Sequence, residues 1–236
     1  MNTKLVDLLK YKKPLDITIG GEVVAKKWVR IIGDSDLQEA YKLARIASAK
    51  IRKELKNPKS MEYQDHILPI EDAPKEDCIA LIIASQGRQF EAEADANIER
   101  PDLPELDEVA IDADAPTLEE QEKLDTEVDK LQEAYQKAKE DYVKDRVASL
   151  EAELKSLPTK ELKKRTEEES VNTVALTTFL VEAQAEKVWR SIYTDKSCTE
   201  REYNNRQEFQ DTDTNVRNQI FTAYSNLEVN GEDIKN

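Results

Sequence analysis

The sequence predicts a predominantly helical α+β protein, in which an N-terminal β-hairpin with an amphipathic helix precedes a long antiparallel helical hairpin and short C-terminal helices. Charged residues make up 36% of the chain, against about 25% in typical globular proteins. Only 5 of the 236 residues are glycine. Apolar residues also recur at helical spacing through most of the second half. This composition makes an all-β sandwich or barrel a poor fit.

The β-hairpin is predicted by two alternating runs near the N-terminus. Apolar and polar residues alternate in Leu15–Ile19 and again in Glu22–Ile32, and Gly20 and Gly21 separate the two runs. Glycine adopts without strain the positive φ that a tight hairpin turn requires. Because a two-stranded hairpin is marginally stable alone, we expect it to pack on the next helix or to find a further strand.

An amphipathic helix is predicted to follow Gly33. Ser35 and Gln38 form a capping box, and Pro58 lies beyond the end of the helix. The apolar face steps by four and three residues through Leu37, Tyr41, Ala44, Ser48, Ile51 and Leu55. The opposite face carries Lys42, Arg45, Lys50, Arg52 and Lys53. This basic face is either solvated or docks the acidic middle of the chain or an acidic partner.

Charge divides the chain into three predicted domains: a hairpin-and-helix unit at 1–57, an acidic proline-containing connection at 58–116, and a helical domain at 117–236. Residues 1–57 carry 13 bases and 7 acids, a net charge of +6, whereas residues 58–116 carry 4 and 16, a net charge of −12. Within the connection, the apolar run Cys78–Ala84 predicts two buried helical turns, with a short strand as the alternative. Residues 101–116 are predicted to be an acidic linker.

Two long apolar stripes predict the helical hairpin. The first helix is expected at 117–157, with a capping box at Thr117 and Glu120 and a stop at Pro158. The second stripe covers 171–192 and is widened by Leu176, Phe179, Leu180, Ala183 and Trp189. Long stripes separated by one proline favour an antiparallel pair. Short helices are expected after a capping box at Thr199 and Glu202, and from Asn215 to Leu227.

The net charge of −15 disfavours nucleic acid and anionic membranes as partners, because both repel an acidic protein. No apolar stretch approaches the roughly 20 residues of a spanning helix. The first residues, MNTKLVDLLKYKK, lack the apolar region of a signal peptide. Two cysteines, Cys78 and Cys198, suit a reducing compartment. We therefore expect a cytoplasmic protein, in the host cytoplasm if it is viral.

The chemical motifs predict no catalytic residue, cofactor or metal. The five glycines cannot be assembled into a phosphate-binding motif. His66 is the one histidine, and we interpret it as a surface or strand-edge residue. Neither cysteine has a thiol or imidazole nearby in sequence, so we interpret both cysteines as core residues. Asp211–Asn215 begins like an EF-hand loop but lacks its glycine and its final glutamate. These residues are instead predicted to cap a helix.

Protein partners are the better expectation. A 41-residue helix at 117–157 has more apolar stripe than its shorter neighbour can cover, so part of the stripe should be available to a partner or another copy. Folding alone explains these positions about as well. The candidate partner contacts, called here the helix seam, are Leu124, Val128, Leu131, Val147, Leu150 and Leu154.

The arrangement of the hairpin and its helix resembles the tail assembly chaperones of long-tailed bacteriophages. The matching stretches are Asp16–Val24, Trp28–Arg30 and the helix Asp34–Leu55, and the C-terminal stretch Glu200–Leu227 is similar to the closing helices of that family. The helical segment 117–193 is an addition to the family pattern. The resemblance implies a non-enzymatic protein of virion morphogenesis that binds the helical tape-measure protein and helps to recruit tail-tube subunits.

The sequence is therefore compatible with three functions. The first is an assembly chaperone or scaffold that binds a helical partner through apolar seams. The second is a structural virion component or adaptor that self-associates through its helical hairpin. The third is an enzyme, which the sequence allows only as a carboxylate-dependent hydrolase without a recognisable motif.

Overall fold

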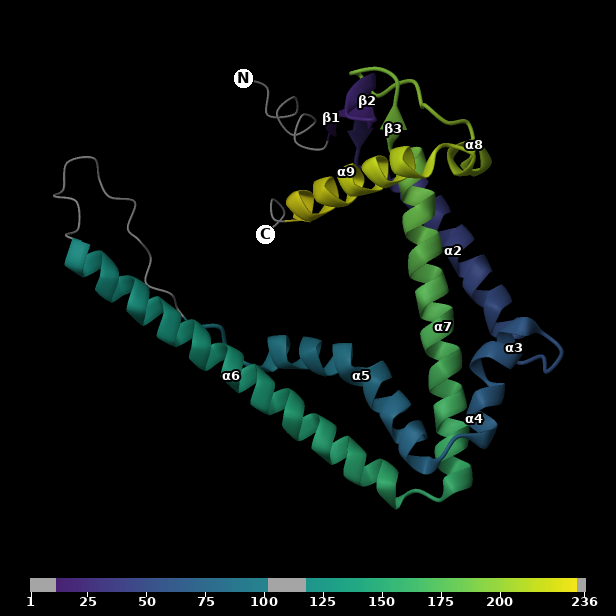
Figure 1. Cartoon of the computed structure of the whole chain (residues 1–236), viewed down its shortest axis with the longest axis vertical. Coiled ribbons are helices and arrows are strands. Elements are labelled where there is room, and N and C mark those ends of the chain that lie inside the picture. Colours follow the sequence, from purple (N-terminus) through teal and green to yellow (C-terminus); the bar gives the residue numbers. More distant parts are fainter. Residues whose placement is uncertain (1–11, 102–117, 233–236) are drawn as a thin grey trace. The chain divides into compact units, whose positions relative to one another are not determined.

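A computed structural model describes residues 12–101 and 118–232 of the chain (Figure 1). It has the predicted fold class, since most of the described residues are helical and a β-hairpin lies near the N-terminus. The strands and helices in chain order are β1 (Lys12–Ile19), β2 (Glu22–Arg30), α2 (Asp34–Glu54), α3 (Met61–His66), α4 (Leu68–Asp72), α5 (Lys75–Asn97), α6 (Leu118–Ser156), α7 (Thr159–Arg190), β3 (Ile192–Tyr193), α8 (Arg206–Gln210) and α9 (Thr214–Glu232).

The chain divides into two compact units. Unit 1 combines residues 1–57 with 174–236, and unit 2 consists of residues 58–173. The predicted boundary at 57 coincides with a boundary of the units, whereas the one at 116 does not, because α5 packs along α6. Helix α7 contributes to both units. The predicted linker at 101–116 lies outside the described residues, apart from Pro101.

The hairpin forms as predicted and gains a third strand. Gly20 and Gly21 make the turn with φ of 62° and 88°, in the region that favours glycine. Strand β3 pairs antiparallel with β2, so the strand order is β1-β2-β3. The pairing places Ile192, two residues after the end of α7, opposite Val29, and both side chains are buried. A strand of two residues has no alternating pattern of its own, which is why the sequence did not reveal it.

The core of unit 1 lies between the sheet and α9 (Figure 1). Strands β1 and β2 contribute Ile17 and Val29, and the end of α7 contributes Val188, Trp189 and the adjoining Ile192. The buried face of α9 follows the predicted helical spacing through Val216, Ile220, Tyr224 and Leu227. This core therefore joins segments from opposite ends of the chain.

The outer side of β1 is held by a side chain of α9. The amide group of Gln219 accepts a hydrogen bond from the backbone N–H of Thr18 at 2.9 Å and donates one to its carbonyl oxygen at 2.8 Å. Thr18 lies at a β-bulge in the pairing with β2. Gln219 thus replaces a neighbouring strand at this position, a device that limits pairing of an edge strand with other chains.

Helix α2 meets α7 through small and aromatic residues. The hydroxyl of Ser48 donates a hydrogen bond to the carbonyl oxygen of Ala175 at 2.8 Å. The rings of Tyr41 and Phe179 stack with their centroids 6.0 Å apart. Ala44, like Ala175, is completely buried, so the contact is close at these points.

Unit 2 is built on an antiparallel pair of helices, α5 and α6. Lys75 Nζ donates to the carbonyl oxygen of Leu157 at 2.8 Å, and Arg146 Nε lies 3.2 Å from Glu93 Oε2. The early part of α5 therefore lies near the end of α6, and the late part of α5 near its middle. The long helix at 117–157 was expected to pair with 171–192, but its close neighbour along its length is α5.

Helix α5 is longer than the predicted two turns. Its 23 residues keep a buried row at four-residue spacing, in which Cys78 and Ile82 are followed by Phe90 and Ala94. The alanines and acids after Cys78–Ala84 favour helix, and this row gives them a buried side. The short-strand alternative for Cys78–Ala84 is therefore wrong.

Two other predicted helix starts are wrong. Helix α7 begins at Thr159, not at 171, because Leu162 and Thr166 extend its buried side toward Pro158. No helix follows the Thr199–Glu202 box. The carboxylate of Asp195 accepts hydrogen bonds from the N–H groups of Thr199 and Glu200 and closes a turn instead. The next helix, α8, starts at Arg206 with Asn205 as its N-cap.

Neighbouring residues of α5 test this packing. Ile82 is fully buried, whereas Leu81 is 52% exposed. We expect Ile82→Ala to lower the free energy of unfolding by about 2–5 kcal/mol because it opens a cavity. Leu81→Ala should change it by about 0.5 kcal/mol or less. Urea unfolding followed by circular dichroism measures both, and equal effects would contradict the assigned helix face.

Candidate functional site

The helix seam predicted on α6 is divided by the structure. Leu150 and Leu154 are buried and form part of the core of unit 2, so folding accounts for them. Val128, Leu131 and Val147 are half-buried. The side chain of Leu124 lies outside the described part of the structure. A role for the seam in partner binding stays a prediction, and it applies best to the half-buried positions.

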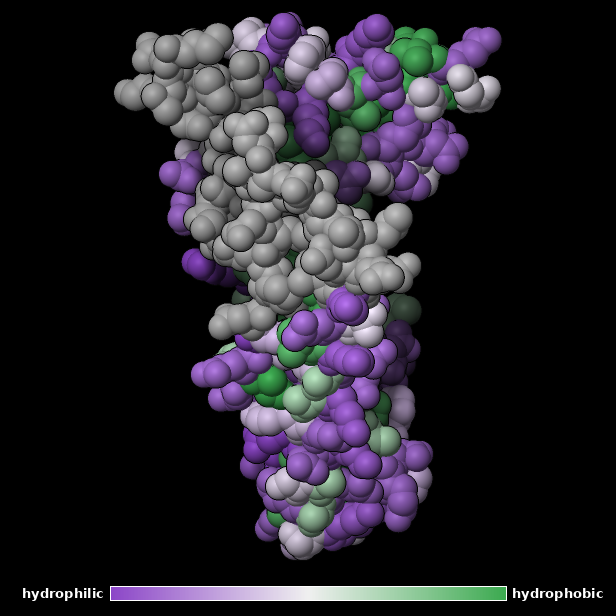
Figure 2. Space-filling model, turned by 90° about the vertical axis from the view of Figure 1, so that its left-hand side faces the viewer, coloured by the Kyte–Doolittle hydropathy of each residue, from purple (hydrophilic) through white to green (hydrophobic). Residues whose placement is uncertain are grey.

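The surface of unit 2 does not present one continuous apolar stripe in the view that faces α6. Figure 2 shows it as mainly hydrophilic, with hydrophobic residues in small separate patches. The charged residues of α5 and α6 form ion pairs across the helix pair, among them Lys139 with Asp95 and Arg146 with Glu93. The hydrogen bond between Lys139 and Asp95 lowers the pKa of Asp95.

A more exposed apolar surface lies on α7. Leu176, Leu180 and Val181 are 57%, 51% and 60% exposed. At 100° per residue, Leu176 and Leu180 lie about 40° apart and Val181 lies about 100° beyond Leu180, whereas the buried Ala175 lies about 100° from Leu176 in the other direction. No charged residue occurs from Ser170 to Val181, although 36% of the chain is charged. We call Leu176, Leu180 and Val181 the α7 apolar surface.

The sequence predicts the apolar residues of this surface but assigns them to a buried face. Leu176 and Leu180 were interpreted as residues that widen a buried stripe. In the structure, Ala175 and Ala183 are buried and Phe179 is half-buried, whereas the two leucines are exposed. Helix α7 therefore has more apolar side chains than its neighbours within unit 1 cover. A helix with one buried face normally carries charged residues on its other side. The absence of charge over residues 170–181 was the sequence feature that indicated an exposed apolar face.

A basic surface lies on α2. Lys42, Ile46, Lys50 and Lys53 recur at steps of four, four and three residues, and all four are exposed. Their spacing puts them on one side of the helix, as predicted for the basic residues. Ile46 is 57% exposed, and the adjoining Leu43 is 38% exposed. This surface therefore combines positive charge with apolar side chains.

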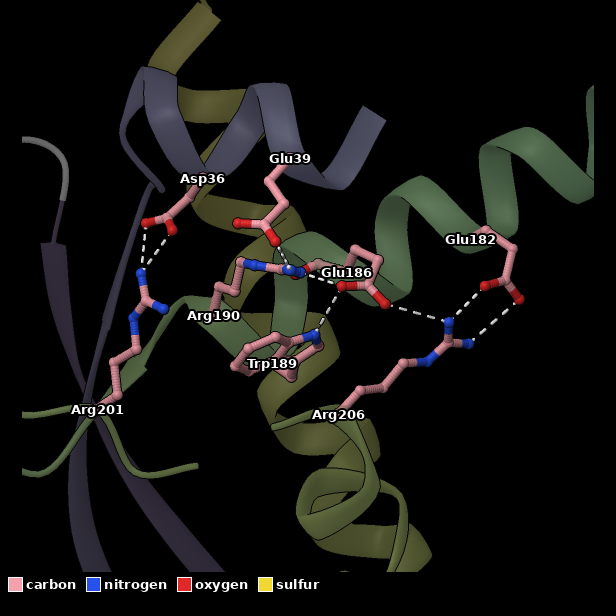
Figure 3. A network of polar contacts seen from close by, with 8 residues as sticks. All are labelled: Asp36, Glu39, Glu182, Glu186, Trp189, Arg190, Arg201 and Arg206. Carbon is pink, nitrogen blue, oxygen red and sulfur yellow. Dashed lines mark hydrogen bonds and ion pairs between the residues drawn. The ribbon is translucent and has the colours of Figure 1, made fainter. Parts of the chain in front are cut away.

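A network of ion pairs fixes the end of α7 within unit 1 (Figure 3). Its centre is Glu186, which is 4% exposed and pairs with the guanidinium of Arg190. Trp189 Nε1 donates a hydrogen bond to Glu186 Oε2 at 3.0 Å, and Arg206 Nη1 lies 3.3 Å from Glu186 Oε1. Every oxygen of this buried carboxylate thus has a donor, which a charge in a low-dielectric interior requires.

Further ion pairs involve α2 and the turn of α7 that precedes Glu186. Glu39 of α2 lies 4.0 Å from Arg190, and Arg201 donates to both carboxylate oxygens of Asp36 at 2.6 Å. Arg206 pairs with Glu182 as well, and this hydrogen bond lowers the pKa of Glu182. The network explains why α2, α7 and the loop before α8 keep their relative positions within unit 1.

The histidine, the two cysteines and Asp213 lie in different parts of the fold. His66 lies at the end of α3, with its Nε2 3.6 Å from Glu62. Cys78 is buried in α5. Cys198 is also buried, and its own burial raises the pKa of its thiol. Asp213 accepts a hydrogen bond from the N–H of Asn215 at 2.8 Å, which confirms the predicted capping role for this carboxylate. Within residues 12–101 and 118–232, no group of three or more metal-binding side chains comes together.

No helix of the described ranges has both the length and the apolar content needed to cross a bilayer. In comparisons with known proteins, no family model, no curated protein and no solved structure matches this chain.

Glu186→Gln tests the centre of the network. The substitution leaves the buried guanidinium of Arg190 without its carboxylate, which typically costs about 3–5 kcal/mol of stability. Glu182→Gln, at a partly exposed position, is the matched control and should cost about 1 kcal/mol or less. Urea unfolding at pH 7 compares the two variants. Similar losses would show that Glu186 is not the centre.

The stability difference between the wild type and Glu182→Gln should depend on pH. Because the pKa of Glu182 is lowered in the folded protein, its ion pair contributes fully above the ordinary glutamate pKa of about 4.3. The contribution is lost as the pH falls through that value toward the folded-state pKa. Unfolding midpoints measured between about pH 6 and pH 3 should therefore converge on acidification. Curves that stay parallel would contradict this.

Proposed function

We propose that this protein is a non-enzymatic assembly chaperone or scaffold that binds a helical protein partner through apolar helix surfaces. The observation that carries the proposal is the α7 apolar surface. Leu176, Leu180 and Val181 are more than half exposed on a helix segment that has no charge. Adjoining exposed apolar groups are typical of sites that bind other proteins.

The spacing of these residues suits a helical partner. Leu176 and Leu180 are one helical turn apart, which is the spacing by which helices anchor in each other's grooves. Burying a fully exposed leucine or valine side chain contributes about 1.5–3 kcal/mol. Leu176, Leu180 and Val181 have a little more than half of their surface still to bury, and this gain offsets part of the cost of association. The half-buried residues Val128 and Leu131 of α6 would form a separate contact of unit 2 if the predicted seam also binds.

The resemblance to tail assembly chaperones suggests the first partner to test. In that proposal the partner is a long tape-measure-like helical protein, and tail-tube subunits join later in assembly. A chaperone of this kind keeps an apolar helix from aggregating until assembly. The high net charge of −15 supports such a role, because it favours solubility of a complex with an apolar partner.

The same surface supports the second function, a structural virion component or adaptor that self-associates. Both functions place partner contacts on apolar helix faces. They differ in the partner, and a chaperone is absent from finished particles whereas a structural component is present in them.

We expect Leu176→Asp combined with Leu180→Asp to abolish partner binding, because each carboxylate would have to be buried in an apolar contact. The measurement is co-expression with the tape-measure-like protein encoded nearest to this chain, followed by size-exclusion chromatography of the soluble complex. Leu81→Asp, at an exposed leucine of unit 2, is the matched control and should leave the complex intact.

Circular dichroism must show that the double variant stays folded. Recovery of the complex with the folded double variant would contradict the role of α7. Self-association of the wild type that the double variant loses, without any complex, would favour the structural component instead.

A further inference from the structure

The basic surface of α2 differs chemically from the α7 apolar surface. Five bases and no acid occur between Lys42 and Lys53, in a chain whose acids outnumber its bases by 50 to 35. Two of the three acids in the first turns of α2 have partners elsewhere, since Asp36 pairs with Arg201 and Glu39 with Arg190. Glu54, beyond the basic stretch, lies 3.8 Å from Lys50. Positive charge is therefore concentrated on this side of α2.

Apolar side chains lie within the same surface. Ile46 is one helical turn from both Lys42 and Lys50, and Leu43 adjoins them. Ile46 is 57% exposed and Leu43 is 38% exposed, so the positive charges surround apolar surface that a partner can bury. An acidic amphipathic helix satisfies both features, because its apolar stripe can cover Ile46 and Leu43 while its carboxylates meet the surrounding lysines and Arg45.

We propose that the α2 surface formed by Lys42, Leu43, Arg45, Ile46, Lys50 and Lys53 binds an acidic amphipathic helix of a partner protein. Charge complementarity supports this partner. A nucleic acid would pair with the bases but leave Ile46 exposed, and no aromatic side chain is interleaved for base stacking. An anionic membrane extends beyond α2, so the rest of a chain with a net charge of −15 would oppose it, and a second copy carries the same net charge.

This inference extends the proposed function and rests on it only in requiring a protein partner. It gives the protein two binding surfaces of different chemistry, one apolar on α7 and one basic on α2. Binding of an acidic helix to α2 would weaken as the salt concentration rises, whereas binding through an apolar contact would not. Salt has this effect because it screens exposed charges, with a screening length of about 10 Å at roughly 0.1 M.

The test uses the full chain and a defined probe. The probe is a fluorescent synthetic helical peptide with leucines at heptad spacing and glutamates at its other positions, and a second peptide has lysines in place of the glutamates. Fluorescence anisotropy should show binding of the glutamate peptide only, weakened about tenfold or more when the salt is raised from about 0.05 M to 0.5 M. Equal binding of both peptides would overturn the proposal.

Two variants locate the site. Lys42→Glu, Arg45→Glu and Lys53→Glu together should weaken binding of the glutamate peptide by about tenfold or more. Ile46→Ser alone should weaken it about fivefold through the lost apolar contact. The matched control, Lys130→Glu, Lys137→Glu and Lys144→Glu on α6, makes the same change in net charge at three exposed positions of unit 2. It should bind much as the wild type does.

The remaining outcomes would overturn the proposal. Equal weakening by the α6 control would reveal unspecific attraction, and an unchanged affinity for folded Ile46→Ser would remove the apolar contact. Binding of a poly-dT oligonucleotide or of phosphatidylserine vesicles that is lost in the α2 variant, without peptide binding, would assign the surface to those ligands. Sedimentation of a dimer that only the α2 variant dissociates would assign it to a second copy.

The proposed function can fail separately from this inference. Leu176→Asp with Leu180→Asp leaves the α2 surface unchanged and should bind the glutamate peptide normally. Conversely, the charge-reversal variant of α2 keeps the α7 apolar surface.

Discussion

The pairing of β3 with β2 is the contact on which unit 1 depends. A β-hairpin alone is marginally stable in water, and the strands of β1 and β2 have one shared apolar side to bury. Strand β3 brings Ile192 against Val29, and the chain that follows it carries α9 across the sheet. The carbonyl oxygen of Ser191 accepts a hydrogen bond from the N–H of Arg30 at 3.0 Å, at the junction of α7 and β3. The N-terminal hairpin is therefore completed by residues from the far end of the chain.

The ion-pair network stabilises that junction at some energetic cost. Buried charges lose their hydration, and their mutual attraction repays the loss only when every donor and acceptor is used. Around Glu186 this condition is met by Arg190, Trp189 and Arg206. The specific geometry of such a network favours one arrangement of α2, α7 and the loop before α8. Neighbouring apolar residues could pack in several ways, whereas these charges can be paired in few.

The two proposed binding surfaces share one origin, because α2 and α7 each carry exposed side chains beyond those that the core buries. On α7 the excess is apolar, at Leu176, Leu180 and Val181. On α2 the excess is basic, with Ile46 among lysines. In unit 2 the balance is different. Leu150 and Leu154, expected to meet a partner, are buried within the unit, and charged side chains of α5 and α6 pair across the surface.

The sequence by itself determined the elements that local physics specifies. Alternation around Gly20 and Gly21 predicted the hairpin, and helical spacing predicted α2, α6 and the buried face of α9. These features depend on residues within one or two turns of each other, so they can be identified without a fold.

Only the tertiary structure decided which faces meet. An amphipathic stripe shows that a helix has a side to bury, but the stripe does not identify the neighbour that covers it. The sequence therefore could not tell that Leu150 and Leu154 would be buried within unit 2, or that Leu176 and Leu180 would stay exposed. The same limit applied to β3, because a two-residue strand is defined by its pairing with β2 and by nothing local.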